Sequence, residues 1–508
     1  MAYHYIGGVR DQQFLMPVDM ADWLDEGHLA WFLIDVVDRL GTAALHARHP
    51  NDGAGRPAYN PDMMLCLLLY AYSTSTRSSR RIEGLCRTDA AYRVIAGGVV
   101  PNHATIARFL VNHEQAIHTI FVQVLTLCAA AGLLDASTVA IDGTKIGADA
   151  ALDRNHTAAW IPTRVDEILA EARETDQAED TQPSSLLDLD RLPAELSTRD
   201  ARTRRLTAAL ARVEEQEAAA REQAEKRQAK ARAEAAQGRR LRGRKPKDSH
   251  AALARAEADE AAIRHQAHTT AAGQAGASGS AATTAEDIRT GGGGRPEVVA
   301  AVAATAAARA TAQEATPTAF KANVTDPDSR IMSTTNGWIR GYNVQAAVNQ
   351  HQIIITGKVS QDANDVGLYE PMVEATGAAL HAAGVTQPVG LILADAGYWS
   401  EDNATAAGPD RLIATQKSHK LRAAARELGT TTGPPPDDAT PLEAMEHRLR
   451  TPEGPAAYAK RSHTVEPAFA FKTNHGYQRF RRRGLTAVES EWSLIATAHN
   501  LGKLHRAS

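Results

Sequence analysis

The feature that most constrains the fold is a pattern that occurs twice, in widely separated parts of the chain. In each copy a short apolar run ends at an aspartate that small residues follow: residues 139–141 precede Asp142, and residues 391–394 precede Asp395. Apolar runs of this length that stop at a turn are typical of buried strands. Because an unpaired buried carboxylate is costly, each aspartate needs a cation or hydrogen-bond donors beside it. The pattern therefore predicts two core strands that each deliver a compensated acid.

Two kinds of partner explain these acids from the residues alone. Ligand sites in α/β sheets gather at strand ends, so neighbouring strands would bring Asp142 and Asp395 face to face. Two carboxylates that close raise the pKa of one of them strongly unless a cation lies between them, and such oxygen ligands suit Mg²⁺ or Mn²⁺. A structural salt bridge between Asp395 and a nearby arginine is the equal alternative.

The first 130 residues predict a helical domain. Pro61 follows Asn60, which is a good helix start. Two short helical patterns, around 79–86 and 103–111, lie on either side of a Gly-Gly break. This spacing fits a helix–turn–helix whose second helix enters a DNA groove, and it also fits an ordinary helical bundle with a charged surface. The candidate DNA-contacting residues of this region are Arg80, Arg81 and Arg108.

The last third of the chain alternates strand and helix patterns. A hairpin is predicted from strands at about 338–348 and 352–359, followed by a helix at about 366–382. The strand that ends at Asp395 comes next, then a helix from about 401, a strand at 411–415 and a helical C-terminal region. This order predicts an α/β arrangement, a mixed sheet flanked by helices.

Between these parts lies a segment of different composition, residues 156–320. Residues 199–240 are rich in helix-forming Ala, Glu, Gln, Arg and Lys, which predicts a long solvated helix or a helical hairpin. The basic run at 238–247, with Arg242, Arg244 and Lys245, resembles a minor-groove hook, although such runs are also common in solvated loops. Residues 271–320 are of low complexity, and we expect poor order there. Their glycine tract predicts a flexible linker, and their alanine-rich tract is compatible with a helix that has no strong packing face.

Composition adds limits rather than a function. The net charge of −4 gives no whole-protein argument for a nucleic-acid partner, so any such argument comes from local basic patches. The three cysteines, Cys66, Cys86 and Cys128, form no C-x-x-C pair, which argues against a cysteine zinc site and a disulfide framework. With no apolar run long enough for a membrane span and no signal-peptide pattern, we expect a cytoplasmic, nucleoid-associated protein.

Three motifs together resemble one family. They are AIDGTKIGADA at 140–150, DAGY at 395–398 and RSHTVEPAF at 461–469. In this order they resemble the bacterial insertion-sequence DDE transposases, in the branch with Asp-Gly-Thr-Lys, Asp-x-Gly-Tyr and Val-Glu-x-x-Phe motifs. The joint occurrence is more specific than any single motif. The resemblance covers roughly residues 1–155 and 320–508.

The resemblance implies an RNase H-like catalytic core and a metal-dependent DNA transposase. Its Asp-Asp-Glu triad would be Asp142, Asp395 and Glu466, which bind two Mg²⁺ ions, with Mn²⁺ as a substitute. Water attack frees a DNA 3′-OH, which then attacks target DNA. The partners implied are double-stranded DNA at the terminal inverted repeats and the target, and a second copy of the chain on paired ends. The corresponding domains are 1–130 for DNA binding, 131–155 and 321–508 for catalysis, and 156–320 as an insertion.

The region around Glu466 departs from the family pattern. The relatives' tyrosine, arginine and lysine correspond to Tyr458, Arg461 and Lys472, each one residue out of register with the glutamate. Arg461 and Lys472 are the candidate DNA-positioning residues, and Glu491 is a rival third carboxylate on a pattern typical of a packing helix. Nearby basic residues, also candidates for DNA contact, are Arg481, Arg482 and Arg483. A nuclease of the same fold and an inactive DNA-binding relict are the alternative functions.

Overall fold

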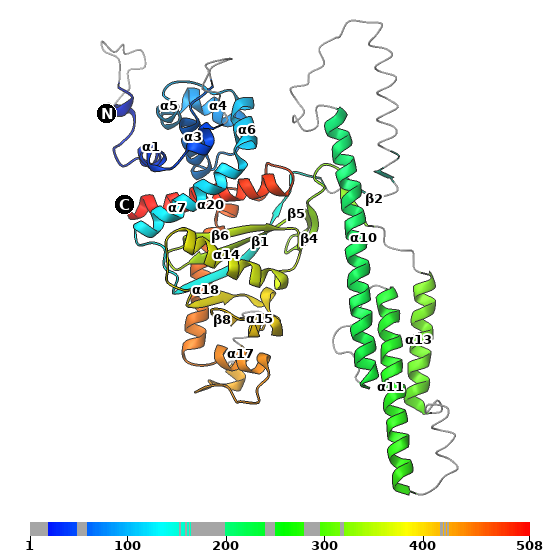
Figure 1. The fold of residues 1–508 in the computed structure, drawn as a ribbon. Helices are drawn as coiled ribbons and strands as arrows, with labels where there is room; N and C mark the ends of the chain where they lie inside the picture. The colour runs from blue at the N-terminus through cyan, green and yellow to red at the C-terminus, as the bar shows by residue number, and fades with distance from the viewer. Residues whose placement is uncertain are drawn as a thin grey trace, which may run out of the picture. The chain divides into compact units, whose positions relative to one another are not determined.

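A computed structural model divides the chain into two compact units (Figure 1). Unit 1 consists of Met1–Arg154 and Asp328–Ser508, and unit 2 is the intervening Asn155–Pro327. The segment of different composition thus forms a unit of its own. The residues that the structure describes are 19–47, 58–151, 154–157, 160, 161, 163, 199–238, 249–278, 295–314, 320–416, 420, 423 and 426–508.

The N-terminal part of unit 1 is helical, as predicted. Asn60 caps the third helix by accepting a hydrogen bond from the backbone N of Asp62 at 2.8 Å, and Pro61 occupies its first turn. That helix is buried almost all round, which explains its continuous apolar sequence. The elements are η1 (Met20–Trp23), α1 (Leu29–Arg39), α2 (Ala43–His46), α3 (Pro61–Ser73), α4 (Ser79–Thr88), α5 (Ala90–Ile95), α6 (His103–Asn112) and α7 (Glu114–Ala130).

A polar contact ties the two helices predicted around 79–86 and 103–111, which are α4 and α6. Glu83 of α4 accepts from the backbone N of His103 at 2.9 Å, and its Oε2 lies 2.7 Å from Nδ1 of the same histidine. Arg87 pairs with the other oxygen of Glu83 at 2.9 Å. The hydrogen bonds from Arg87 and His103 lower the pKa of Glu83 to about 2. The start of α6 is therefore fixed against α4 by an ionised carboxylate.

A mixed sheet forms the centre of unit 1, which confirms the predicted α/β arrangement. Its order is β4-β5-β1-β7-β8, with β6 paired to β5. Pairings of β5 with β1, β4 and β6 are antiparallel, whereas β1–β7 and β7–β8 are parallel. The strands are β1 (Thr138–Gly147), β4 (Arg330–Thr334), β5 (Gly337–Asn349), β6 (Ile354–Ser360), β7 (Leu391–Ala394) and β8 (Asp410–Ile413).

Helices from the second half of unit 1 cover this sheet and join it to the N-terminal helices (Figure 1). The last helix packs against β6 on one side and against α3 and α7 on the other, and its Trp492 is buried. The sheet and the N-terminal helices therefore share one continuous core. The helical elements are η4 (Val366–Leu368), α14 (Tyr369–Ala382), η5 (Ala396–Tyr398), α15 (Glu401–Thr405), α17 (Pro441–Leu449), α18 (Glu453–Phe469), α19 (Phe471–Asn474) and α20 (Leu485–Ala507).

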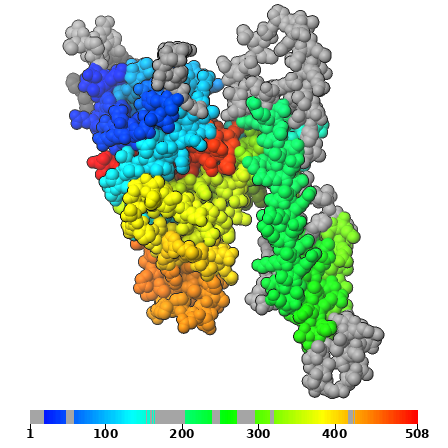
Figure 2. Space-filling view, in the orientation of Figure 1, coloured from blue at the N-terminus to red at the C-terminus, as the bar shows by residue number. Residues whose placement is uncertain are grey.

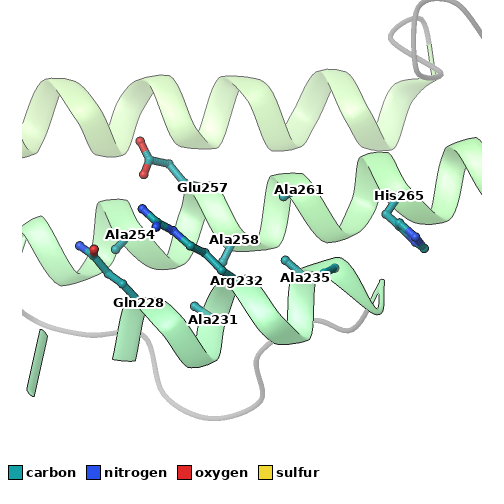
Figure 3. A pocket seen from close by; sticks show the side chains of 10 residues that line it. Gln228, Ala231, Arg232, Ala235, Ala254, Glu257, Ala258, Ala261 and His265 are labelled. Carbon is teal, nitrogen blue, oxygen red and sulfur yellow. The ribbon is translucent and has the colours of Figure 1, made fainter. Parts of the chain in front are cut away.

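Unit 2 is dominated by three long helices, α10 (Arg199–Ala236), α11 (Ser249–Ser278) and α13 (Pro296–Glu314), with a small sheet of β2 (Asn155–Thr157) and β3 (Lys321–Asn323). Helix α11 packs against both α10 and α13. A groove of about 480 Å³ between α10 and α11 is lined mainly by alanines, with Arg232, Glu257 and His265 among them (Figure 3). Alanine methyl groups fill little space, so this groove reflects small side chains at a helix contact.

None of the helices that the structure describes is long and apolar enough to cross a membrane.

Candidate active site

The two aspartates of the repeated pattern lie side by side. Strands β1 and β7 run parallel, with Ile141 opposite Ala394, so Asp142 and Asp395 are the next residues on neighbouring strands. Asp142 lies within β1, which continues to Gly147, whereas β7 ends just before Asp395. The Asp395 carboxylate caps the following turn by accepting from the backbone N of Gly397 at 2.8 Å. The predicted pairing of the two strands is confirmed, whereas the prediction that Asp142 ends its strand is wrong, because β1 stays paired with β5 as far as Gly147.

A basic side chain from α18 completes the immediate surroundings of the pair. Arg461 Nη1 lies 2.7 Å from Asp142 Oδ2 in an ion pair that is largely removed from solvent. Burial raises the pKa of Asp142 to about 6, opposed by the Arg461 charge and reinforced by the Asp395 charge. Asp142 therefore has both an arginine partner and a carboxylate neighbour, and the arginine that the sequence alternative assigned to Asp395 pairs with Asp142 instead.

Lys472 reaches the same strand as Arg461 does. Its Nζ donates to the backbone carbonyl of Lys145 at 2.8 Å and to Oγ1 of Thr144 at 3.2 Å. Burial lowers the pKa of Lys472. The two basic residues that the resemblance assigned to DNA positioning thus both contact the Asp-Gly-Thr-Lys segment of β1, Arg461 at its start and Lys472 at its end.

Glu466 is not gathered with the aspartates. It lies on α18 with an exposed side chain, and it makes no hydrogen bond or ion pair with the part of the chain that the structure describes. Among those described residues, no three His, Cys, Asp or Glu side chains form a group that could hold a metal ion. The aspartate pair itself fits a hard divalent cation, because both donors are carboxylates whose mutual repulsion a cation would relieve.

Glu491, the rival third carboxylate, has a different role. Its side chain is fully buried and accepts hydrogen bonds from Arg77 Nη1 at 2.9 Å and from the backbone N of Arg481 and Arg482 at 2.9 and 3.0 Å. Burial raises the pKa of Glu491, and the Arg77 charge opposes that rise. The same arginine stacks over the Tyr477 ring at 4.0 Å. This network joins the N-terminal helices to the C-terminal segment and confirms that α20 is a packing helix.

The C-terminal basic run is divided between ion pairs and exposed positions. Arg482 pairs with Glu114, and Arg483 pairs with Asp149 at 2.6 Å, whereas Arg481 is exposed. In the N-terminal helices Arg80, Arg81 and Arg108 are exposed on α4 and α6. The proposed hook residues Arg242, Arg244 and Lys245 lie outside the described residues.

One acidic residue near the pair was not singled out from the sequence. Asp365, which precedes η4, accepts hydrogen bonds from Asn343 and Gln345 of β5. The signal that would have found it is the pair of polar residues two apart in an otherwise apolar strand, because buried amides need a polar partner.

Comparison with known families gives two matches, both within unit 1. Residues 18–112 match the family described as Transposase domain (DUF772), and residues 435–505 match Transposase DDE domain. No curated protein and no solved structure matches the chain.

Both matched families are transposase families, and the second is a DDE domain. The matches therefore support the resemblance to insertion-sequence DDE transposases. The first matched segment spans α1 to α6, and the second spans α17, α18, α19 and most of α20. It includes Arg461, Glu466 and Lys472, whereas Asp142 and Asp395 lie outside both segments.

Proposed function

We propose that the chain cuts DNA at the ends of its insertion sequence and joins the freed 3′-OH to target DNA. The observation that carries this proposal is the parallel register of β1 and β7, which brings Asp142 and Asp395 together beside Arg461. A mixed sheet with one acid within β1 and the other directly after the neighbouring β7 is consistent with an RNase H-like core. The transposase families matched at both ends of unit 1 supply the reaction class.

In this proposal Asp142 and Asp395 hold the divalent cations through their carboxylate oxygens, with Glu466 as the third ligand. A bound Mg²⁺ or Mn²⁺ activates the attacking oxygen and offsets charge on the phosphate and the leaving oxygen. To hold a cation, Asp142 would give up its ion pair with Arg461, and the guanidinium would then be available for a DNA phosphate. Glu466, on the same helix as Arg461, would have to turn toward the aspartates to serve as the third ligand. Lys472, beside Thr144, supplies a second cationic contact for the DNA backbone.

The test is incubation of the full chain with a labelled duplex that carries the element's end and its flank. We expect a nick at the boundary with Mg²⁺ or Mn²⁺ and none with EDTA. Joining of the nicked end to a second DNA would establish strand transfer, and cleavage without joining would indicate a nuclease. Specific binding without cleavage in either cation would contradict the proposal and favour an inactive DNA-binding protein. Native mass measurement of the end-bound complex would show whether two copies assemble.

Cation binding should depend on pH through Asp142. Because its pKa is raised to about 6, protonation competes with the cation, and Mn²⁺ affinity should fall about tenfold per pH unit below that value. Without a cation, the stability of the folded chain depends on pH in the opposite direction. The raised pKa of Asp142 favours the folded chain at low pH, and this contribution to the free energy of unfolding is lost as pH rises from about 4 through 6. Titration with Mn²⁺ between pH 5 and 8 measures the first effect, and equal affinity across that range would contradict it.

The exposed arginines of α4 and α6 should contribute to end binding. Replacing Arg81 or Arg108 with alanine should weaken binding of the end duplex and reduce the salt dependence of that binding by about one unit of slope each. Arg39, an exposed arginine on α1, is the matched control, and Arg39→Ala should leave both quantities nearly unchanged. Fluorescence anisotropy over a series of salt concentrations measures the slope. An equal change in all three variants would contradict a specific DNA-binding surface on α4 and α6.

A further inference from the structure

A glycine lies one or two residues after each aspartate, and both glycines face a third carboxylate, that of Asp365. Gly143 and Gly397 belong to the Asp-Gly-Thr-Lys and Asp-Ala-Gly-Tyr motifs, and neither has a positive φ. Backbone conformation therefore does not explain them. A Cβ atom on Gly143 would lie closest to Gln345 Nε2 and 2.9 Å from Asp365 Oδ1, and a Cβ on Gly397 would lie 2.9 Å from both Asp365 Oδ2 and Asp395 Oδ1. Real Cβ atoms essentially never come this close to another heavy atom, so Gly143 leaves room for Gln345 and Asp365, and Gly397 leaves room for Asp365 and Asp395.

Two amides of β5 fix the position of Asp365. Its Oδ1 accepts from Nδ2 of Asn343 at 2.7 Å and from Nε2 of Gln345 at 2.9 Å. Both amide side chains are buried, and the Tyr398 hydroxyl donates to Gln345 Oε1. With both ends of its amide bonded, Gln345 has one orientation, and it directs its NH₂ group at the carboxylate. Asp365 is thereby held in one place although it precedes η4 at the end of a loop.

The network approaches the aspartate pair from behind the sheet. Gln345 is the register partner of Gly143, whereas Asp142 is opposite Ala346. Since side chains alternate along a strand, Gln345 and Asp365 lie on the face opposite to the Asp142 side chain and Arg461. The other oxygen of Asp365, Oδ2, lies near Asp395, just beyond the end of β7. That oxygen and Asp395 Oδ1 are each 2.9 Å from the same point, the Cβ position of Gly397.

The negative charge of Asp365 beside Asp395 is unfavourable unless a cation binds there. Asp142 has Arg461 as its partner, whereas the hydrogen bonds that Asp395 and Asp365 accept from described residues come only from uncharged donors. Because Asp365 Oδ2 and Asp395 Oδ1 each lie 2.9 Å from the same point, the two oxygens are at most twice that distance apart. The two negative charges therefore repel each other, and a cation bound at Asp395 removes that repulsion. The fixed negative charge of Asp365 is therefore favourable when the site is loaded.

We propose that Asp365 is a positioning residue of the active site, which orients the Asp395 turn through Gly397 and strengthens cation binding by Asp142 and Asp395. This inference rests on the proposed function, because it takes the aspartate pair as the cation site. Asp365 is outside the two segments that match known families. It acts through Asp395 and makes no contact of its own with DNA.

The test compares Mn²⁺ affinity of the full chain with that of Asp365→Asn, measured by calorimetry. Asparagine keeps the oxygen that accepts from both amides and replaces the free oxygen with an uncharged group, so the fold should persist. We expect affinity to fall roughly tenfold or more, the usual effect of removing an outer partner of a metal ligand. The cation concentration for half-maximal cleavage should rise by the same factor, while the rate at saturating cation changes little.

Asp362→Asn is the matched control, because Asp362 is an exposed aspartate on the same loop that bonds only to Ser360 within the described structure. It should leave Mn²⁺ affinity unchanged. Wild-type affinity in Asp365→Asn, with binding lost in Asp395→Asn, would overturn the inference and leave the proposed function intact. Wild-type affinity in Asp395→Asn would overturn both. An equal loss in Asp365→Asn and Asp362→Asn would also overturn the inference, because it would reflect net charge alone.

Discussion

Replacing Asp395 with asparagine should abolish metal-dependent cleavage at the element's end, with a rate at least about a thousandfold below that of the wild type. Asparagine has nearly the same size, and its carbonyl oxygen can still accept from the backbone N of Gly397, so the turn after β7 should persist. What is lost is the charge that faces Asp142. The cleavage rate on a labelled end duplex, at saturating Mg²⁺, is the measurement.

Two further variants sharpen this result. Asp142→Asn should show a loss of similar size, and the double variant should lose little more, because both carboxylates act on one cation site. Asp402→Asn removes an exposed aspartate from the first turn of the nearby α15 and should cleave normally. Residual cleavage near the wild-type rate in Asp395→Asn would mean that the strand-end acid is structural.

Replacing Glu491 with alanine should lower the free energy of unfolding by about 3–5 kcal/mol, the range for breaking a buried ion pair. The variant leaves the Arg77 guanidinium buried without its carboxylate and leaves the backbone N–H groups of Arg481 and Arg482 without their acceptor. Urea unfolding of the full chain measures the change. Glu489→Ala, an exposed glutamate two residues earlier on α20, should change stability by no more than about 0.5 kcal/mol.

The same position separates the two candidates for the third carboxylate. If Glu491 is structural, Glu491→Gln should bind Mn²⁺ as the wild type does. The variant should instead be less stable, which would appear as a lower urea midpoint. Loss of Mn²⁺ binding with an unchanged urea midpoint would contradict this assignment and would make Glu491 a ligand in place of Glu466.

The strand-end aspartates were predictable because both signals are local. An apolar run followed by Asp predicts a strand in both places, although β1 continues past Asp142 to Gly147, and the parallel pairing of β1 with β7 then brings the acids together. The hairpin of β5 and β6 and the helices α3, α4 and α6 follow from similarly local patterns, namely caps, glycine breaks and alternation.

The rest of the site depends on long-range contacts that no local pattern contains. No local pattern distinguishes Arg77 from the other arginines of the N-terminal helices, yet Glu491, 414 residues away, pairs with it in the core. Asp365 lies in a polar loop whose composition gives no hint of the amides that hold it. Glu466 has its motif, but whether a helical side chain faces the sheet depends on how α18 packs, and here Arg461 faces Asp142 instead.

The most direct test of the central claim, that Asp142 and Asp395 form one cation site, is cleavage of the protein backbone by bound Fe²⁺. Fe²⁺ accepts similar oxygen ligands, and with ascorbate and peroxide it produces radicals that cut nearby peptide bonds. We expect cuts within 142–144 and 395–397, mapped by mass spectrometry, that excess Mg²⁺ suppresses and that Asp395→Asn eliminates. Cuts confined to other segments, or cuts at these positions that persist in Asp395→Asn, would contradict it.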